Sequence, residues 1–196
     1  MPYIGLLKPK YCPVTKSTDS NGNETETYGE VKVLAKAVTA STTINTSKTK
    51  FYADDSVAES VNEFINGNIT LQVDDLSNEV LADICGASIS TDTGDITMRD
   101  TDTAAMIRLG FLVRRYKNDK SEYRGIVFSR IVFDIPADDY ETKGESIVFK
   151  STTITGEIMR NHEHIWKDMS AWKTNEQDAL DWVNTKLKPT PISASL

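Results

Sequence analysis

The chain has 196 residues, a formal net charge of -7, 39% hydrophobic residues and 26% charged residues. This length allows one domain with a hydrophobic core of its own. The excess of acids argues against a general nucleic-acid-binding protein, because neutralising phosphates takes clustered Lys and Arg, and against docking on anionic lipid. No stretch approaches the ~20 apolar residues of a spanning helix, and residues 1–7 lack the basic start of a secretory signal. We therefore expect a protein made and folded in a cytoplasm, with no membrane partner.

Short runs of Thr, Val and Ile between Gly, Asn, Asp and Ser predict a mainly β fold. Two or three strands are expected around 31–34, 38–44 and 50–53. The clearest hairpin signal is Asn66-Gly67, because this dipeptide suits the positive φ angles of a type I′ turn. The strand that follows alternates strictly, with Ile69, Leu71 and Val73 on one face.

A longer pair of strands is predicted at 106–117 and 122–134, joined by a turn over residues 118–121. Strict alternation in the second strand gives two faces. One face holds Gly125, Val127, Ser129, Ile131 and Phe133, and the other holds Arg124, Ile126, Phe128, Arg130 and Val132. Neither face is cleanly polar, so we expect both to be covered. A last strand region, 146–158, places Val148, Ile154 and Ile158 on one face.

Two helices have capping signals. Ser77 can cap a short helix over 78–85, with Gly86 as the residue that ends it. A capping-box pattern at 174–177 opens a helix that runs to about residue 187, so the helices span about 77–86 and 175–187. The apolar stripe of the second helix is Ala179, Leu180, Val183 and Leu187, with Trp182 beside it.

Two polar segments are longer than an ordinary loop. Segment 15–28 contains almost no apolar residues, and segment 87–105 is rich in Thr and Asp. We expect both to be mobile loops of a single domain, 1–196, that ends in a helix and arm over 174–196. The first segment is expected to be mobile in the isolated chain and to become ordered between copies. Deleting residues 17–26 should then leave a folded chain that cannot polymerise.

Charge is segregated along the chain. Residues 74–102 carry eight acids and one base, whereas residues 107–130 carry seven bases and two acids. One interpretation is pairing within the chain and solvated faces, and the other is complementary surfaces on neighbouring copies.

No cofactor, catalytic or metal site is predicted. The chain lacks GxSxG, P-loop, GxGxxG and HExxH motifs. His162 and His164 could share a metal on a strand, but spacing marks out no third ligand. Residues 19–30 have calcium-loop ligand types, but Glu24 stands where the turn needs Gly. Cys12 and Cys85 belong to no CxxC pair, so we expect two buried, free thiols.

Several short motifs follow one another along the chain. The first three are Met1-Pro2-Tyr3-Ile4-Gly5-Leu6, Phe51-Tyr52-Ala53-Asp54-Asp55 and Gly67 to Ser77 with Gly86 after it. The others are Leu109-Gly110-Phe111, Tyr123-Arg124, Thr142-Lys143-Gly144-Glu145-Ser146 and Thr155-Gly156. In this order, the motifs resemble the major tail protein family of long-tailed, non-contractile phages (siphophages) of Gram-positive hosts. The resemblance covers residues 1 to about 158.

The resemblance implies a β-sandwich or barrel-like tail-tube fold with a flanking helix. It implies a structural virion protein and no enzyme: six copies form a ring, and rings stack into the tail tube that conducts DNA during ejection without binding it tightly. The implied partners are other copies of the chain, the tape measure protein and the tail terminator and tip proteins.

Three sets of residues are candidates for roles in such a tube. An acidic and polar set is expected to face the lumen, because carboxylates and hydroxyls repel or ignore phosphates: Asp54, Asp55, Glu59, Glu63, Thr70, Gln72 and Asp74. The candidate subunit interface is Arg108, Arg114, Arg115, Asp92, Asp95, Asp100 and Asp102. The candidate inter-ring loop is Asp19, Asn21, Asn23, Glu24 and Glu26.

Two other function classes stay open. A carbohydrate- or receptor-binding β-sandwich module would share the strand pattern, and Trp166, Trp172 and Trp182 could stack on sugars. An enzyme is the third interpretation. Its acid–base catalysis would be carried out by the carboxylates Asp54, Asp55, Glu59 and Glu63.

Overall fold

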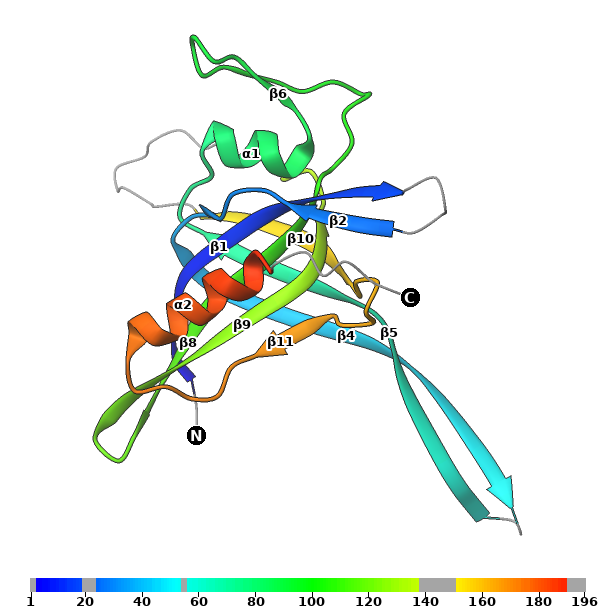
Figure 1. Cartoon of the computed structure of the whole chain (residues 1–196). Coiled ribbons are helices and arrows are strands. Elements are labelled where there is room, and N and C mark those ends of the chain that lie inside the picture. Colours follow the sequence, from blue (N-terminus) through cyan, green and yellow to red (C-terminus); the bar gives the residue numbers. More distant parts are fainter. Residues whose placement is uncertain (1–2, 19–23, 54–55, 138–150, 190–196) are drawn as a thin grey trace, which may run out of the picture.

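A computed structural model describes residues 3–18, 24–53, 56–137 and 151–189. The described residues form eleven strands and two helices (Figure 1). The strands are β1 (Tyr3–Thr18), β2 (Glu24–Tyr28), β3 (Lys32–Val33), β4 (Ala37–Ala53), β5 (Ser56–Val73), β6 (Ser88–Ile89), β7 (Ile96–Thr97), β8 (Met106–Lys117), β9 (Lys120–Phe133), β10 (Thr152–Met159) and β11 (Lys167–Met169). The helices are α1 (Asn78–Cys85) and α2 (Glu176–Leu187). The prediction of a mainly β protein is confirmed.

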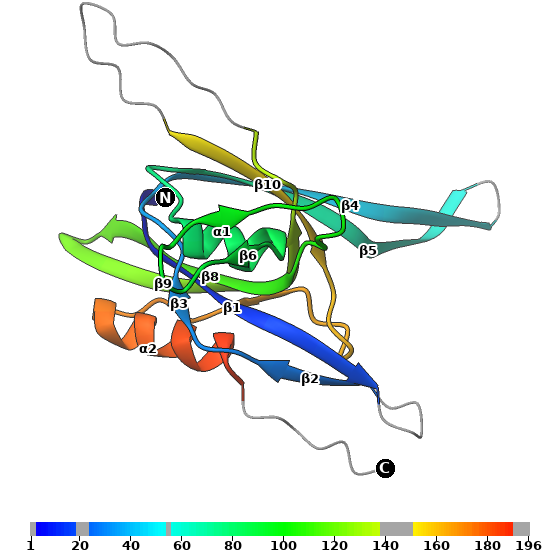
Figure 2. The ribbon, with the colours of Figure 1, turned by 90° about the horizontal axis from the view of Figure 1, so that it is seen from above.

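Nine of these strands form one antiparallel sheet in the order β2-β1-β8-β9-β10-β5-β4, with β3 beside β1 and β11 beside β9. Figure 2 shows β4, β5 and β10 on one side of β8 and β9, and α2 on the other. The larger core lies between the two parts of the sheet and is closed at one end by α1. The second core lies between α2 and the opposite face of β8 and β9. Both faces of this hairpin are thus covered, as its sequence predicted.

The β8–β9 hairpin has a tighter turn and a less regular second strand than expected. Asn118 and Asp119, with φ angles of 51° and 58°, make the turn alone, and strand pairing resumes at Lys120. The register then shifts between Ile107 and Leu109, which face Ile131 and Phe128. Two residues of β9 therefore oppose one of β8, and this bulge reverses the alternation. Ile131 joins Phe128 in the larger core, so the predicted strict alternation is wrong beyond Phe128.

Asn66-Gly67 is not a hairpin turn, and that prediction is wrong. Strands β4 and β5 run through the region, and Gly67 pairs with Ile44 in mid-strand. A Cβ on Gly67 would lie 2.8 Å from Cδ1 of Ile44, so the glycine serves close approach rather than a turn. A register shift beside Asn45 leaves Ile65 as the extra residue of a bulge. The strands expected at 38–44 and 50–53 are both parts of β4.

Both helices form where their capping signals lie. The Ser77 side chain accepts a hydrogen bond from the backbone N–H of Val80, and Gly86, with φ at 70°, ends α1. Helix α2 starts one residue later than expected, because Asn175 rather than Thr174 is its N-cap. Its predicted apolar stripe is buried in the second core.

The structure describes some, but not all, of the other residues that were predicted to be buried. Ile154 and Ile158 of β10 are buried in the larger core, as expected. Residues 138–150, which include Val148, lie outside the described residues. Cys12 and Cys85 are both free and buried, as predicted, and burial raises the pKa of each thiol.

Candidate assembly surfaces and a candidate ligand pocket

The segment predicted to be a mobile inter-ring loop is largely a β-hairpin. Residues 15–18 end β1 and pair with β2, residues 24–28. Glu26 is only 6% exposed and forms an ion pair with Arg130 of β9. Nε of Arg130 donates a hydrogen bond of 2.6 Å to Oε1 of Glu26. Residues 15–18 and 24–28 are therefore paired strands rather than the expected loop, and a buried ion pair joins them to β9. Asp19, Asn21 and Asn23 lie outside the described residues, as does the side chain of Glu24.

A polar cluster surrounds Glu26. The Tyr28 hydroxyl donates to Oε2 of Glu26 at 2.8 Å, and Nδ1 of His162 lies 3.9 Å from the same oxygen. The guanidinium of Arg108, which is 3% exposed, lies 5.3 Å from the centre of the Tyr28 ring. Burial and the hydrogen bond to Glu26 raise the pKa of Tyr28 to about 12, so the phenol stays protonated at neutral pH. This cluster fixes β2 to β8 and β9.

The segment 87–105 contains the small β6–β7 ribbon rather than a wholly irregular loop. The ribbon is joined to α1, where Nδ2 of Asn78 donates to the Gly94 carbonyl at 3.0 Å. Two of the four candidate interface acids serve local turns: Asp95 accepts from Thr93, and Asp102 accepts from the backbone of Arg99. Asp92 and Asp100 are exposed.

The three candidate interface arginines differ in their surroundings. Arg108 is buried within its own chain, with its guanidinium over the Tyr28 ring. Nε of Arg115 donates to Glu122 at 2.6 Å, and its guanidinium lies 3.9 Å from the centre of the Trp172 ring. Arg114 is half-buried beside Gly5. The acidic β6–β7 ribbon and the β8–β9 turn lie at opposite ends of the molecule (Figure 1). The structure therefore does not bring the two charged sets together within one chain.

The lumen candidates lie mainly on β5. Thr70 and Gln72 point away from the core, because Ile69, Leu71 and Val73 are buried, and Glu63 is exposed beyond them. Asp74, after the strand, accepts hydrogen bonds from the backbone of Lys36 and Asp75, which lower the pKa of its carboxyl. Asp54, Asp55 and the side chain of Glu59 lie outside the described residues.

Strand pairing extends this polar surface across three strands, which sequence reasoning missed. Four rows lie side by side in the register: Thr39–Gln72–Thr153, Ser41–Thr70–Thr155, Thr43–Asn68–Glu157 and Asn45–Asn66. We call these residues the polar face. Its described residues include no Lys, Arg or His, and all are exposed or half-buried. Side-chain hydrogen bonds link the last rows, since Nδ2 of Asn45 donates to Asn66 at 2.8 Å and Nδ2 of Asn66 donates to Glu157 at 2.7 Å. Polar residues at every second position of β4, namely Thr39, Ser41, Thr43 and Asn45, were the signal that could have revealed it, although Thr42 interrupts the alternation.

Beyond the polar face, β4 and β5 continue as a projecting arm. Strand β10 pairs with β5 only as far as Gly67, and from there to Ala53 and Ser56 the described pairing is between β4 and β5 alone. Both views show the arm extending past the rest of the molecule (Figures 1 and 2). A lone two-stranded ribbon is marginally stable in water, so the arm is suited to contact another surface.

The residues that suggested sugar binding or metal binding are otherwise engaged. Trp166 stacks on Phe64 with ring centres 4.7 Å apart, and the guanidinium groups of Arg115 and Arg124 lie 3.9 Å and 4.7 Å from the centre of the Trp172 ring. Trp182 packs in the second core. His162 and His164 follow β10 in a turn instead of sharing a strand face, and no group of three or more metal-ligating side chains occurs among the described residues.

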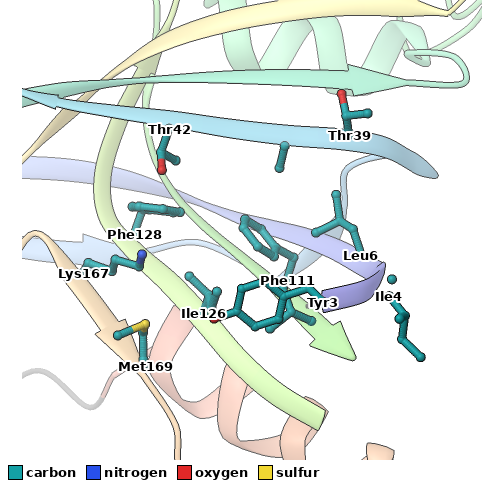
Figure 3. A pocket seen from close by; sticks show the side chains of 13 residues that line it. Tyr3, Ile4, Leu6, Thr39, Thr42, Phe111, Ile126, Phe128, Lys167 and Met169 are labelled. Carbon is teal, nitrogen blue, oxygen red and sulfur yellow. The ribbon is translucent and has the colours of Figure 1, made fainter. Parts of the chain in front are cut away.

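An apolar pocket of about 500 Å³, not predicted from the sequence, opens between β4 on one side and β1, β8, β9 and β11 on the other (Figure 3). Phe111, Ile126 and Phe128 line it as buried residues, and Tyr3, Ile4 and Met169 line it as exposed ones. Lys167 of β11 is the one cationic side chain among the described lining residues. Burial, and secondarily the positive charge of Arg124, lower the pKa of its ammonium group.

Neither α1 nor α2, the helices of the described residues, has the length and apolar character that crossing a membrane requires. A comparison of the chain with models of protein families found no match, and neither did a comparison with curated proteins.

Proposed function

We propose that this protein is a structural, self-assembling tail-tube subunit with a β-sandwich-type fold, in which stacked hexameric rings form a conduit for DNA. The observation that carries the proposal is the polar face. Hydroxyl, amide and carboxylate groups cover three adjacent strands, with no cation among the described residues of the face. Such a surface offers phosphates no counter-charge, as a conduit that must not retain DNA requires.

The projecting arm supports self-assembly as the mode of action. Its two strands pair only with each other in the described structure, so a second copy can supply the contacts that the arm lacks within its own chain. The resemblance of the sequence motifs to siphophage major tail proteins points in the same direction. The tape measure, terminator and tip proteins are the further partners that this proposal entails, and the virion tail is its location.

Electron microscopy of the purified chain tests assembly directly. We expect rings or tubes about 100 Å wide, the size of six domains around a pore. A variant in which residues 47–62 are replaced by a short turn should keep its folded body, because the described pairing in this part of the arm is between β4 and β5 alone, but should form no tubes. Dispersed wild-type monomers that bind glycans would contradict the proposal and favour a carbohydrate-binding module.

Lysines placed on the polar face test its orientation. Thr43→Lys with Asn68→Lys adds two adjacent cations, which a ring multiplies sixfold. Tubes should still form, and DNA ejection from assembled particles should slow or stall. The matched control is Thr185→Lys on the exposed side of α2, together with a second exposed substitution, Gln177→Lys. Ejection kinetics that are equal in both variants would place the polar face away from DNA.

A further inference from the structure

The pocket beneath β4 combines an apolar lining with one cation, and its volume lies within the range of small-molecule sites. Lys167 of β11 and Thr42 of β4 line opposite walls, and Figure 3 shows their side chains on either side of the Phe128 ring. Leu6 and Phe111 lie in another part of the pocket. Most of the lining side chains are therefore apolar, and the polar ones are Lys167, Thr42, Thr39 and Tyr3.

The ammonium of Lys167 lacks a counter-ion among the described residues. Its Nζ lies 5.4 Å from the centre of the Phe128 ring and 5.8 Å from that of Trp166, which are weak substitutes for a carboxylate. Asp168, the next residue, pairs with Lys186 instead at 3.4 Å. An arriving carboxylate would therefore gain a partly desolvated partner with which no acid of the described ranges pairs.

We propose that this pocket binds an aliphatic monocarboxylate, with the carboxylate on Lys167 and the hydrocarbon chain against Leu6, Phe111 and Ile126. The single charge selects a monoanion, and the buried aromatic and aliphatic lining selects an unbranched apolar chain over a polar one. The inference concerns the individual chain and does not depend on its assembly into tubes.

Titration calorimetry on the full chain at pH 7 tests the pocket with three probes of one chain length. Decanoate should bind more tightly than decanol, and decylammonium should bind least. Lys167→Met, which keeps the length of the side chain, should weaken decanoate binding about tenfold and leave decanol unchanged. Lys167→Arg should retain the preference for decanoate, and Lys117→Met should behave as the wild type because Lys117 is exposed and does not line the pocket.

A second variant keeps the test independent of Lys167. Ala40→Phe fills the pocket from β4 and should abolish binding of both decanoate and decanol while far-ultraviolet circular dichroism stays unchanged. Equal affinities of the wild type for decanoate and decanol, or no binding of decanoate at millimolar concentration, would overturn the proposal. So would a Lys167→Met variant whose only defect is in self-association, since a second copy would then be the occupant.

Discussion

Glu26 joins a hairpin of the amino-terminal region to the centre of the sheet through a buried charge. Its carboxylate accepts hydrogen bonds from Arg130 and Tyr28, and Arg130 in turn donates to the Arg160 carbonyl at 3.2 Å. Both members of the ion pair are less than a tenth exposed. Removing one member of such a pair leaves the other charged and buried, which costs far more than an exposed pair.

We therefore expect Glu26→Gln to lower the free energy of unfolding by about 3–5 kcal/mol. The matched control is Glu122→Gln, which breaks the partly exposed pair with Arg115 and should cost about 1 kcal/mol or less. Urea unfolding followed by tryptophan fluorescence measures both. Equal losses of unfolding free energy in the two variants would show that burial of the Glu26–Arg130 pair adds nothing to stability.

The same carboxylate makes stability depend on pH. Burial alone would raise the pKa of Glu26, but hydrogen bonds from Arg130 and Tyr28 and the charge of Arg130 hold it below its ordinary 4.5. The stabilisation is thus complete above pH 4.5 and is lost as pH falls through the lower, folded-state pKa. Unfolding free energies between pH 3 and 7 should fall more steeply in acid for the wild type than for Glu26→Gln. Parallel curves would contradict this assignment.

At the scale of elements, helix α2 depends on two glycines of the strands beneath it. A Cβ on Gly125 would lie 2.6 Å from Cε3 of Trp182, and one on Gly110 would lie 2.7 Å from Cγ1 of Val183. The glycines therefore set how closely α2 approaches β8 and β9, as overlap of this size requires the helix to shift.

Gly125→Ala should destabilise the protein by about 1–3 kcal/mol through overpacking beneath α2. Near-ultraviolet circular dichroism should change as well, because Trp182 is displaced. Gly5→Ala is the control, since a Cβ there meets nothing closer than 3.9 Å and should alter stability little. A Gly125→Ala variant with wild-type unfolding would show that α2 docks loosely.

Elements with local signals were predictable from the sequence. The caps at Ser77 and Gly86 and the turn at Asn118 use only neighbouring residues, so α1 and the β8–β9 hairpin were expected close to where they form. The prediction of a hairpin turn at Asn66-Gly67 is wrong because the role of Gly67 depends on Ile44, over twenty residues away. Likewise, β2 has a polar sequence, and only its distant partner Arg130 explains why it is ordered.

The candidate sites were predictable to a smaller extent for the same reason. Alternation in β5 placed Thr70 and Gln72 opposite the core, but the rows of the polar face require the register with β4 and β10. The pocket is made by five strands that are far apart in sequence, so no local pattern marks Lys167.

At the scale of the whole molecule, the β8–β9 hairpin belongs to both cores. Phe111 and Phe128 contribute to the larger core, whereas Leu112 and Val127 contribute to the second. Neither core can lose this hairpin without exposing apolar surface in the other. We therefore expect thermal unfolding to be a single transition in which the signals of Trp182 and of the backbone change together. Two separate transitions would show that the cores are independent.

Sharing the hairpin has a consequence for the order of events in folding. The two-residue turn at 118–119 lets β8 and β9 meet at a small loop-closure cost, whereas β10 must find β5 across a long stretch of chain. The hairpin is thus suited to nucleate folding. Ile126→Val in β9 should mainly slow refolding, and Ile154→Val in β10 should mainly speed unfolding, as stopped-flow kinetics in urea can measure. If refolding instead slows more for Ile154→Val, the rate-limiting step is the docking of the strands that carry the polar face. The surface proposed to face DNA would then be among the first parts of the chain to form.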